Sequence, residues 1–197
     1  GVDEQIGRIL QGLKDQKLDE NTIVIIMADH GNCLGKHSEV SKNNVYEESL
    51  RIPYIVNWKG RIEPRMDNTF LGSIPDIYPT LLDLMGMKKQ IPATINGKSY
   101  AQYYLNGQGP KPSEQFILGA IISDNVDINT GFRGVRTTDF KLSYVKKKGK
   151  NELVLFDLKA DPFEMNNIYN PQHPMDKKLT PVLKKYLHET GDGFVLD

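Results

Sequence analysis

Four residues between positions 29 and 42 have side-chain types and a spacing that could do chemistry: Asp29, His30, His37 and Lys42. Asp29 and His30 directly follow an apolar run at residues 22–27. In open α/β sheets, ligands bind outside the carboxyl ends of strands, so this position suits a site. Asp29 offers a hard oxygen ligand of the kind that Ca²⁺ or Mg²⁺ prefers, although an isolated Asp after a strand is more commonly a turn former or a helix cap.

His37 and Lys42 lie in the polar loop that follows. An imidazole has an unperturbed pKa of about 6.5, so His37 can donate or accept a proton near neutral pH. The ammonium of Lys42 is a compact charge suited to an oxyanion. Each residue also has a plain structural interpretation, His37 as a histidine that supports the fold and Lys42 as a solvated surface lysine.

The elements around this loop are predicted from hydrophobic periodicity. Apolar residues at i, i+3, i+4 and i+7 predict an amphipathic helix over residues 1–13. The β-branched run at residues 22–27 favours a strand buried on both faces, as in a parallel sheet covered by helices. A short helix is expected around residues 45–50, followed by a second core strand at residues 52–56.

Beyond residue 70 the chain predicts one clear helix and then a long surface segment. Ser73 and Asp76 match a capping box, which predicts a helix that runs to about Met85. Residues 88–115 are rich in Pro, Gly and Asn. This composition predicts a surface excursion with a short helix near residues 99–105.

Short runs separated by turn residues after Gly131 predict an antiparallel meander, with strands at residues 132–136, 140–145 and 153–158. A closing helix is predicted from Pro181 to Leu187. Four lysines are expected in one hairpin loop, as a solvated turn rather than an anion site: Lys146, Lys147, Lys148 and Lys150.

Composition and charge exclude several classes of protein. Lys+Arg and Asp+Glu both number 25 in 197 residues, so no net field attracts nucleic acid or an anionic membrane. No stretch approaches the roughly 20 apolar residues of a membrane helix, and the amino terminus lacks the pattern of a signal peptide. The only cysteine is Cys33, so no intrachain disulfide can form. Because the chain opens inside a helical pattern without an initiating Met, we expect it to be part of something longer.

Five segments match the motifs of one family, in that family's order: residues 21–31 (Asn-Thr-Ile-Val-Ile-Ile-Met-Ala-Asp-His-Gly), 34–37 (Leu-Gly-Lys-His), 41–53 (Ser-Lys-Asn-Asn-Val-Tyr-Glu-Glu-Ser-Leu-Arg-Ile-Pro), 76–86 (Asp-Ile-Tyr-Pro-Thr-Leu-Leu-Asp-Leu-Met-Gly) and 156–167 (Phe-Asp-Leu-Lys-Ala-Asp-Pro-Phe-Glu-Met-Asn-Asn). Together they resemble the type I, formylglycine-dependent sulfatases of the alkaline phosphatase superfamily. The resemblance covers nearly the whole chain.

The resemblance implies an α/β fold that is the C-terminal part of an alkaline-phosphatase-like mixed α/β sheet, followed by a small antiparallel β-sheet subdomain with a C-terminal helix. Residues 1–115 would be the C-terminal portion of the sulfatase catalytic domain. Residues 116–197 would be the small subdomain.

The resemblance also assigns roles to the site residues. Asp29 and His30 would be metal ligands, with Ca²⁺ expected first and Mg²⁺, Mn²⁺ or Zn²⁺ as alternatives, because imidazole is a less typical calcium ligand. In the alternative, His30 hydrogen-bonds the sulfate or the adjacent loop. Lys42 would contact the sulfate oxygens, and His37 would face the substrate or leaving group as a proton donor. Three neighbours are interpreted as structural ion pairs and caps: Glu47, Glu48 and Arg51.

The family's nucleophile is a formylglycine made from Cys or Ser inside a Cys/Ser-x-Pro/Ala-x-Arg motif. Cys33 is followed by Leu-Gly-Lys and does not fit that motif. The chain therefore holds no nucleophile, and the formylglycine is expected in an N-terminal part that this chain lacks.

From these residues we expect the C-terminal fragment of a sulfatase that hydrolyses sulfate esters of a sulfated carbohydrate or an aryl sulfate, and that is inactive alone. The alternatives are a phosphonate monoester or phosphodiester hydrolase of the same superfamily, or a non-catalytic association module. Exposed strand edges and apolar surface would favour homo-oligomers. Neither nucleic acid nor a membrane is an expected partner, and family analogy favours a periplasmic or extracellular location.

Overall fold

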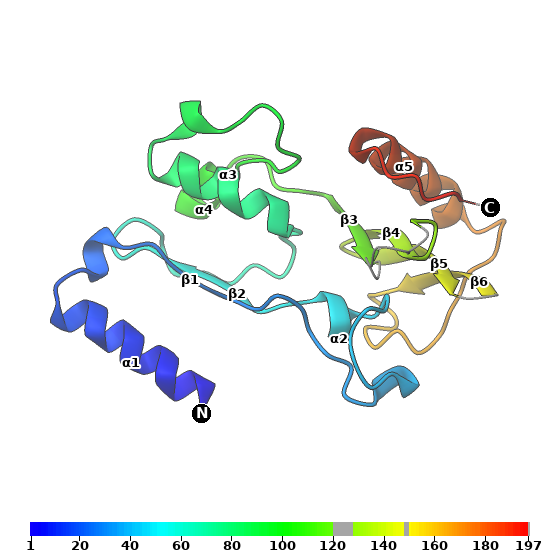
Figure 1. The fold of residues 1–197 in the computed structure, drawn as a ribbon, viewed down its shortest axis with the longest axis horizontal. Helices are drawn as coiled ribbons and strands as arrows, with labels where there is room; N and C mark the ends of the chain where they lie inside the picture. The colour runs from blue at the N-terminus through cyan, green and yellow to red at the C-terminus, as the bar shows by residue number, and fades with distance from the viewer. Residues whose placement is uncertain (120–127, 148–149, 197) are drawn as a thin grey trace.

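The computed structural model describes residues 1–119, 128–147 and 150–196. The predicted α/β class is confirmed, because helices accompany a two-stranded sheet of β1 and β2 and a four-stranded sheet of β3 to β6 (Figure 1). The elements follow one another in this order: α1 (Val2–Asp15), β1 (Val24–Met27), α2 (Glu47–Leu50), β2 (Tyr54–Asn57), α3 (Ile74–Leu84), α4 (Ala101–Asn106), β3 (Glu114–Gly119), β4 (Gly131–Thr137), β5 (Phe140–Lys147), β6 (Lys150–Asp157) and α5 (Pro174–Thr190).

The first strand does not lie in a parallel sheet. β1 pairs with β2 in the antiparallel sense, from Val24 opposite Asn57 to Met27 opposite Tyr54. No residue of β1 is fully buried, and Met27 is exposed. The expectation of a strand buried on both faces in a parallel sheet is therefore wrong for the described residues, because an apolar β-branched run reports strand propensity but not which neighbours the strand finds.

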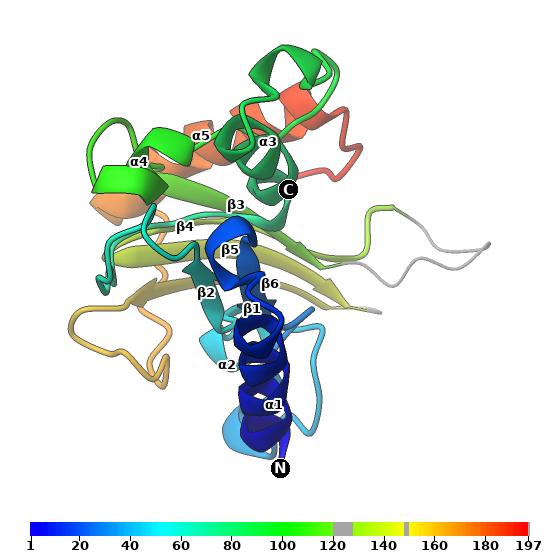
Figure 2. The ribbon, with the colours of Figure 1, turned by 90° about the vertical axis from the view of Figure 1, so that its left-hand side faces the viewer.

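The four-stranded sheet is covered on both faces (Figure 2). Consecutive strands pair antiparallel in the order β3-β4-β5-β6. Because side chains alternate between the faces of a strand, β4 and β6 each contribute buried residues to two cores. One core joins the sheet to α5: Val135, Leu142, Tyr144, Leu155, Leu179, Leu183, Leu187 and Phe194. The other core joins it to the segment that leads into α2: Val45, Phe132, Val154 and Phe156.

Two helices show how well the boundaries were predicted. α3 begins after Ser73, whose backbone N–H donates to Oδ2 of Asp76 at 2.9 Å, so the predicted capping box is confirmed. α5 begins at Pro174, whereas the prediction began at Pro181, which lies inside the helix. The ring nitrogen of His173 caps the true start by accepting the N–H of Met175 at 3.2 Å.

The lysine-rich hairpin differs from the predicted solvated loop. Lys146 and Lys147 belong to β5 and Lys150 opens β6, while Lys148 lies outside the described residues. Lys146 is only 8% exposed and its Nζ lies 5.3 Å from the centroid of the Phe194 ring. The prediction that this cluster is a solvated turn is therefore wrong for Lys146, because its aliphatic stem is buried on the face that α5 covers.

One strand was not predicted. β3 pairs with β4 from Glu114 opposite Thr137 to Gly119 opposite Phe132. It begins within the segment that was expected to be a surface excursion. The division into subdomains at residues 115 and 116 stays a prediction. No helix in the described part of the chain is long and apolar enough to cross a membrane.

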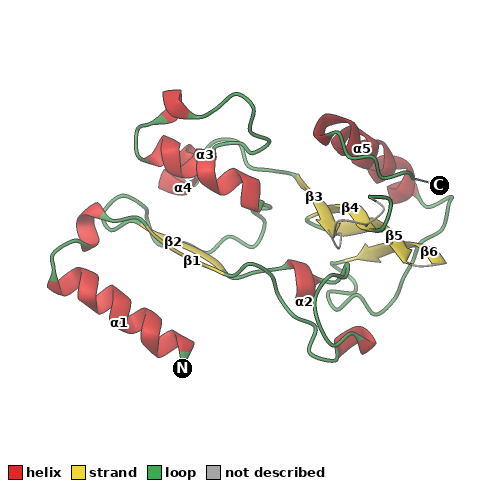
Figure 3. Cartoon of the chain, in the orientation of Figure 1, coloured by secondary structure: helices red, strands yellow, loops and turns green. Residues whose placement is uncertain are grey.

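The chain between β1 and α2 is mostly loop (Figure 3). Its only regular element is a short 3-10 turn, Lys36–Ser38. This segment, residues 28–46, is called the site loop below because it contains all four residues that could do chemistry.

Candidate functional site

Asp29, His30 and Lys42 meet in the site loop. Nε2 of His30 lies 3.1 Å from Oδ2 of Asp29 and also contacts Nζ of Lys42. A carboxylate, an imidazole and an ammonium group therefore surround one point, although Lys42 follows the other two by more than ten residues. The Asp29 side chain is 82% exposed, so this point is open to solvent.

The ring of His30 is oriented by the backbone. Its Nδ1 lies 2.8 Å from the carbonyl oxygen of Gly31, which can only accept a hydrogen bond. In the neutral ring, Nδ1 therefore carries the proton and Nε2 keeps its lone pair. Metal-binding histidines commonly donate their second ring N–H to a backbone carbonyl in this way. The lone pair of His30 and the carboxylate of Asp29 thus fit two ligands of a divalent cation, and Lys42 fits an oxyanion beside it.

Two ligands do not complete a metal site. The residues that the structure describes contain no group of three or more His, Cys, Asp or Glu side chains that could hold a metal ion. Ca²⁺ takes about six to eight oxygen ligands, so a cation here would need further donors from water, substrate or residues beyond the described chain. The metal, and its identity, stay predictions.

The site loop has an unusual backbone. Four of its non-glycine residues have positive φ: Leu34 (48°), His37 (57°), Ser38 (58°) and Asn43 (67°). Such conformations are uncommon outside glycine and persist only where the surroundings enforce them, often at functional sites. Buried Cys33 and Asn44 tie the loop together, because Nδ2 of Asn44 donates to Sγ of Cys33 at 3.2 Å.

The contacts that the structure gives His37 are with Glu48 and Tyr46 rather than with Asp29, His30 or Lys42. The side chain of His37 is 4% exposed, and its Nε2 lies 3.2 Å from Oε2 of Glu48. Its ring stacks on that of Tyr46, with a centroid distance of 3.7 Å and an interplanar angle of 2°. These contacts support the loop. The predicted role of His37 as a proton donor stays a prediction.

The start of the site loop is docked against α2. The N–H of Gly31 donates to the carbonyl oxygen of Ser49 at 2.9 Å. A Cβ at position 31 would lie 2.1 Å from the carbonyl oxygen of Glu48, so a larger residue would push the loop and α2 apart. The glycine that follows Asp29 and His30 thus has a packing reason.

A charge cluster, formed by Glu47, Arg136, Lys141 and Glu164, lies on the other side of α2. The carboxylate of Glu47 lies 3.1 Å from Nη2 of Arg136 and 3.2 Å from Nζ of Lys141. Lys141 also pairs with Oε1 of Glu164, and both of these side chains are 0% exposed. Oε2 of Glu164 accepts the backbone N–H of Glu47 at 2.7 Å.

Burial and charge act in opposite directions on the acids around α2. Burial alone would raise the pKa of Glu47, but Lys141 and Arg136 outweigh it and hold that pKa below its usual value. For Glu164, burial dominates and raises the pKa despite the pairing with Lys141. Burial would also raise the pKa of Glu48, yet Lys36, a backbone hydrogen bond of Glu48 and His37 keep it low.

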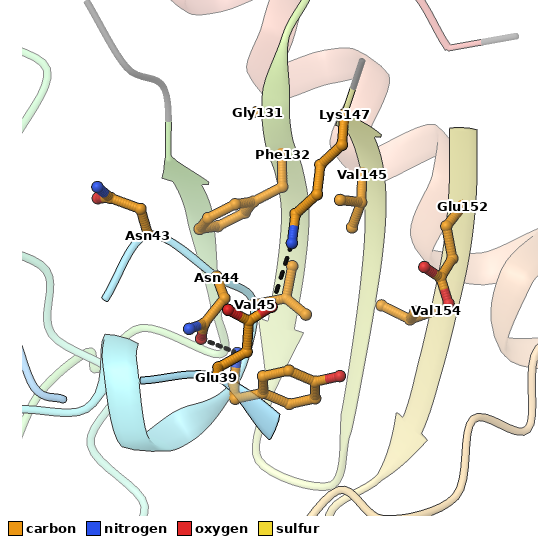
Figure 4. Close-up of a pocket in the computed structure, with 11 residues that line it drawn as sticks. Glu39, Asn43, Asn44, Val45, Gly131, Phe132, Val145, Lys147, Glu152 and Val154 are labelled. Atoms are coloured by element: carbon orange, nitrogen blue, oxygen red, sulfur yellow. Dashed lines mark hydrogen bonds and ion pairs between the residues drawn. The ribbon is translucent and has the colours of Figure 1, made fainter. Parts of the chain in front are cut away.

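A small pocket of about 120 Å³ adjoins the site loop on the side of β4, β5 and β6 (Figure 4). Apolar side chains of Val45, Phe132 and Val154 line it. At its edge Nζ of Lys147 pairs with Oε1 of Glu39 at 3.2 Å. The pocket brings residues of the four-stranded sheet next to the segment that contains Lys42.

The prediction that Glu47 and Glu48 form structural ion pairs is confirmed, but the sequence did not reveal which partners hold α2. Gly31 and Glu164 lie in two of the segments that carry the family resemblance, but nothing in those segments predicted that both contact the same helical turn. Lys141 follows an aromatic residue in an ordinary alternating strand, and a lysine there would normally be expected on a solvated face. Only the fold places it against two carboxylates.

The mixed α/β fold, with its ligand-type residues at the carboxyl end of β1, is an alkaline-phosphatase-like architecture. The family model for the C-terminal region of N-sulphoglucosamine sulphohydrolase matches residues 35–192. That match covers more than half of the chain, and the chain therefore belongs to the sulfatase family.

Relatives agree with this assignment. An endo-4-O-sulfatase of Bacteroides thetaiotaomicron is 34% identical over 94% of this chain and 38% of its own length. The crystal structure of a putative sulfatase from Bacteroides fragilis has a TM-score of 0.88 and 38% identity, covering 98% of this chain and 41% of its own. A second structure, solved with its substrate D-glucosamine-2-N,6-O-disulfate, has a TM-score of 0.80 and 29% identity over 98% of this chain and 39% of its own. The chain thus spans about two fifths of the length of these relatives.

Proposed function

We propose that this chain carries one side of the active site of a sulfatase that hydrolyses sulfate esters of a sulfated glycan. The observation that supports it most is the meeting of Asp29 and Lys42 at Nε2 of His30. The sulfated sugar named as the substrate of one relative supports the substrate class. An aryl sulfate would present the same tetrahedral group.

In this proposal each residue has a separate task. Asp29 and His30 hold a divalent cation, Ca²⁺ first, which supplies Lewis-acid stabilisation of the sulfate oxygens. Lys42 neutralises negative charge on the same oxygens. His37 is the candidate proton donor, and it would act through Nδ1, because Glu48 occupies its Nε2. The nucleophile, a formylglycine, would come from outside this chain, so the chain alone should show no turnover. A periplasmic or extracellular location goes with a glycan substrate.

The test is sulfate release by the product of the full open reading frame that includes this chain. Sulfated glucosamine, an aryl sulfate and a phosphonate monoester would be compared as substrates, before and after chelation of divalent cations. Lys42→Met should lower kcat/KM for the sulfate ester by about 10²–10³, as expected for the loss of one stabilising donor.

A matched control is Lys59→Met. Lys59 is a surface lysine whose partners are Asp19 and Glu20, in the turn before β1. It should leave kcat/KM unchanged. An unchanged rate in Lys42→Met would refute the proposed oxyanion contact, and faster turnover of the phosphonate than of both sulfate esters would favour the phosphonate hydrolase alternative.

A further inference from the structure

α2 is a single helical turn that contacts both the site loop and the four-stranded sheet. On the loop side, Ser49 accepts the N–H of Gly31, and Glu48 pairs with Lys36 and His37. On the sheet side, Glu47 is the residue that enters the charge cluster. A four-residue helix has too few internal hydrogen bonds to hold its own place, so its position depends on these outside contacts.

Lys141 is the centre of the sheet-side contacts. Its Nζ lies 3.2 Å from Oε1 of Glu47 and pairs with Glu164 as well, and no part of its side chain is exposed. One ammonium group thus neutralises two carboxylates from segments that are more than 100 residues apart. Removing it would leave the fully buried carboxylate of Glu164 without its cation, while Glu47 would keep only Arg136.

The segment at residues 161–167 is shaped to deliver Glu164. Oδ2 of Asp161 closes its turn by accepting the N–H of Asn166 at 2.8 Å. Asn167 docks the segment on β6, because its Oδ1 accepts the N–H of Leu155 at 3.0 Å and its Nδ2 donates to the carbonyl of Leu153 at 3.0 Å. Glu164 itself has a positive φ of 54°, a conformation that a Glu keeps only where its surroundings enforce it.

Buried ion pairs are weak evidence for stability, since the cost of desolvating the charges offsets much of their attraction. Their better attested effect is to specify one arrangement, because any other leaves a buried charge unpaired. In this cluster the arrangement that is specified is the position of α2 on the sheet.

We propose that Lys141 and Glu164 are positioning residues for the candidate oxyanion site. They fix α2 on the four-stranded sheet, and α2 in turn fixes Gly31 and the site loop, which presents His30 and Lys42. Neither residue touches the site, so each acts through Glu47 and α2. The positional part of this inference stands on the contacts alone. Its effect on sulfate binding rests on the proposed function.

The test uses three variants of the 197-residue chain. Lys141→Met removes the bridging charge at nearly constant volume, and Lys141→Arg keeps it. Lys146→Met is the matched control, because it removes another buried lysine of β5 that lies on the opposite face, near Phe194. The readouts are the amide resonances of Gly31 and the imidazole resonances of His30 by NMR, and a titration with inorganic sulfate.

Lys141→Met should shift the resonances of Gly31 and His30 and weaken sulfate binding roughly 10- to 100-fold, as the loss of outer partners of a site commonly does. Lys141→Arg should recover most of the affinity. Lys146→Met should leave the resonances of Gly31 and His30 in place and the affinity for sulfate within twofold of the parent. Glu164→Gln gives the same test if Lys141→Met does not fold, since it retains a hydrogen-bond acceptor for Glu47 but loses the charge.

The two ways of failing are distinct. If Lys141→Met is folded but leaves the resonances of Gly31 and His30 in place, the positioning role is refuted. If the parent chain binds no sulfate while those resonances still move in Lys141→Met, the oxyanion site of the proposed function is refuted and the positioning role stands. Equal shifts in Lys146→Met would show a general response to lost charge in β5, which also refutes the inference.

Discussion

The β1–β2 ribbon and the four-stranded sheet are built from similar apolar, β-rich sequence, yet they differ in what covers them. No residue of β1 or β2 is fully buried, and α1 contributes no buried residue either. In the four-stranded sheet, Val135, Leu142 and Leu155 are completely buried between α5 and the strands. The comparison shows that a hydrophobic pattern indicates which side chains of a strand can be buried. Whether they are buried depends on which other elements pack against the strand.

The largest expected effect follows from this difference. Leu155→Ala should lower the free energy of unfolding by about 2–5 kcal/mol, because it opens a cavity in a fully packed core. Ile25→Ala in β1 should cost much less, since that position is only partly buried. Urea unfolding of both variants measures the comparison. Equal losses would show that the ribbon is as well packed as the sheet.

A second prediction concerns the junction between the two regions. Gly31→Ala should lower the free energy of unfolding by about 1–3 kcal/mol, as overpacking does, because the new Cβ would lie 2.1 Å from the carbonyl oxygen of Glu48. Gly12→Ala in α1 is the matched control, since nothing lies within 4 Å of a Cβ there. A helical Gly→Ala change at that exposed site should be neutral or stabilising. Thermal melting of the two variants distinguishes a packing requirement from general intolerance of glycine replacement.

How much of the fold and of the candidate site could be predicted from the sequence depends on how far apart in the sequence the interacting residues lie. The capping box at Ser73 and Asp76 is local, and it was predicted with its helix. Asp29, His30 and Lys42 were singled out from residue types, position after a strand and the family resemblance. The charge cluster was not, because Lys141 and Glu164 acquire their roles from contacts with Glu47 across 94 and 117 residues. The pairing of β1 with β2 was not predicted either, because the alternation of side chains along a strand does not indicate which strand it pairs with.

A third prediction concerns how the stability contributed by Asp67, which lies outside both sheets, depends on pH. The Tyr103 hydroxyl donates to Asp67 and is the largest influence lowering the pKa of that carboxyl to about 2. A depressed folded-state pKa gives stability that is complete above the unfolded value of about 3.9 and is lost as pH falls towards 2. Allowing for partial exposure, Asp67 should contribute about 1–2 kcal/mol over this window. Tyr103→Phe should lose stability at neutral pH and show a shallower decline between pH 4 and pH 2 in urea unfolding. A parallel decline in the two proteins would contradict the assignment.

The smallest effect on stability should accompany the largest effect on association. Ile9 on α1 is 65% exposed, so Ile9→Ser should change the free energy of unfolding by less than about 0.5 kcal/mol. The apolar side of α1, with Ile9 and Leu10, adds to exposed apolar residues of the ribbon such as Ile55. Exposed apolar surface favours self-association, so the chain should form dimers or larger species whose fraction falls in Ile9→Ser. Size-exclusion chromatography across a concentration series measures this. A clean monomer at high concentration would show that the exposed ribbon does not mediate association, and the contrast between ribbon and sheet would then concern packing alone.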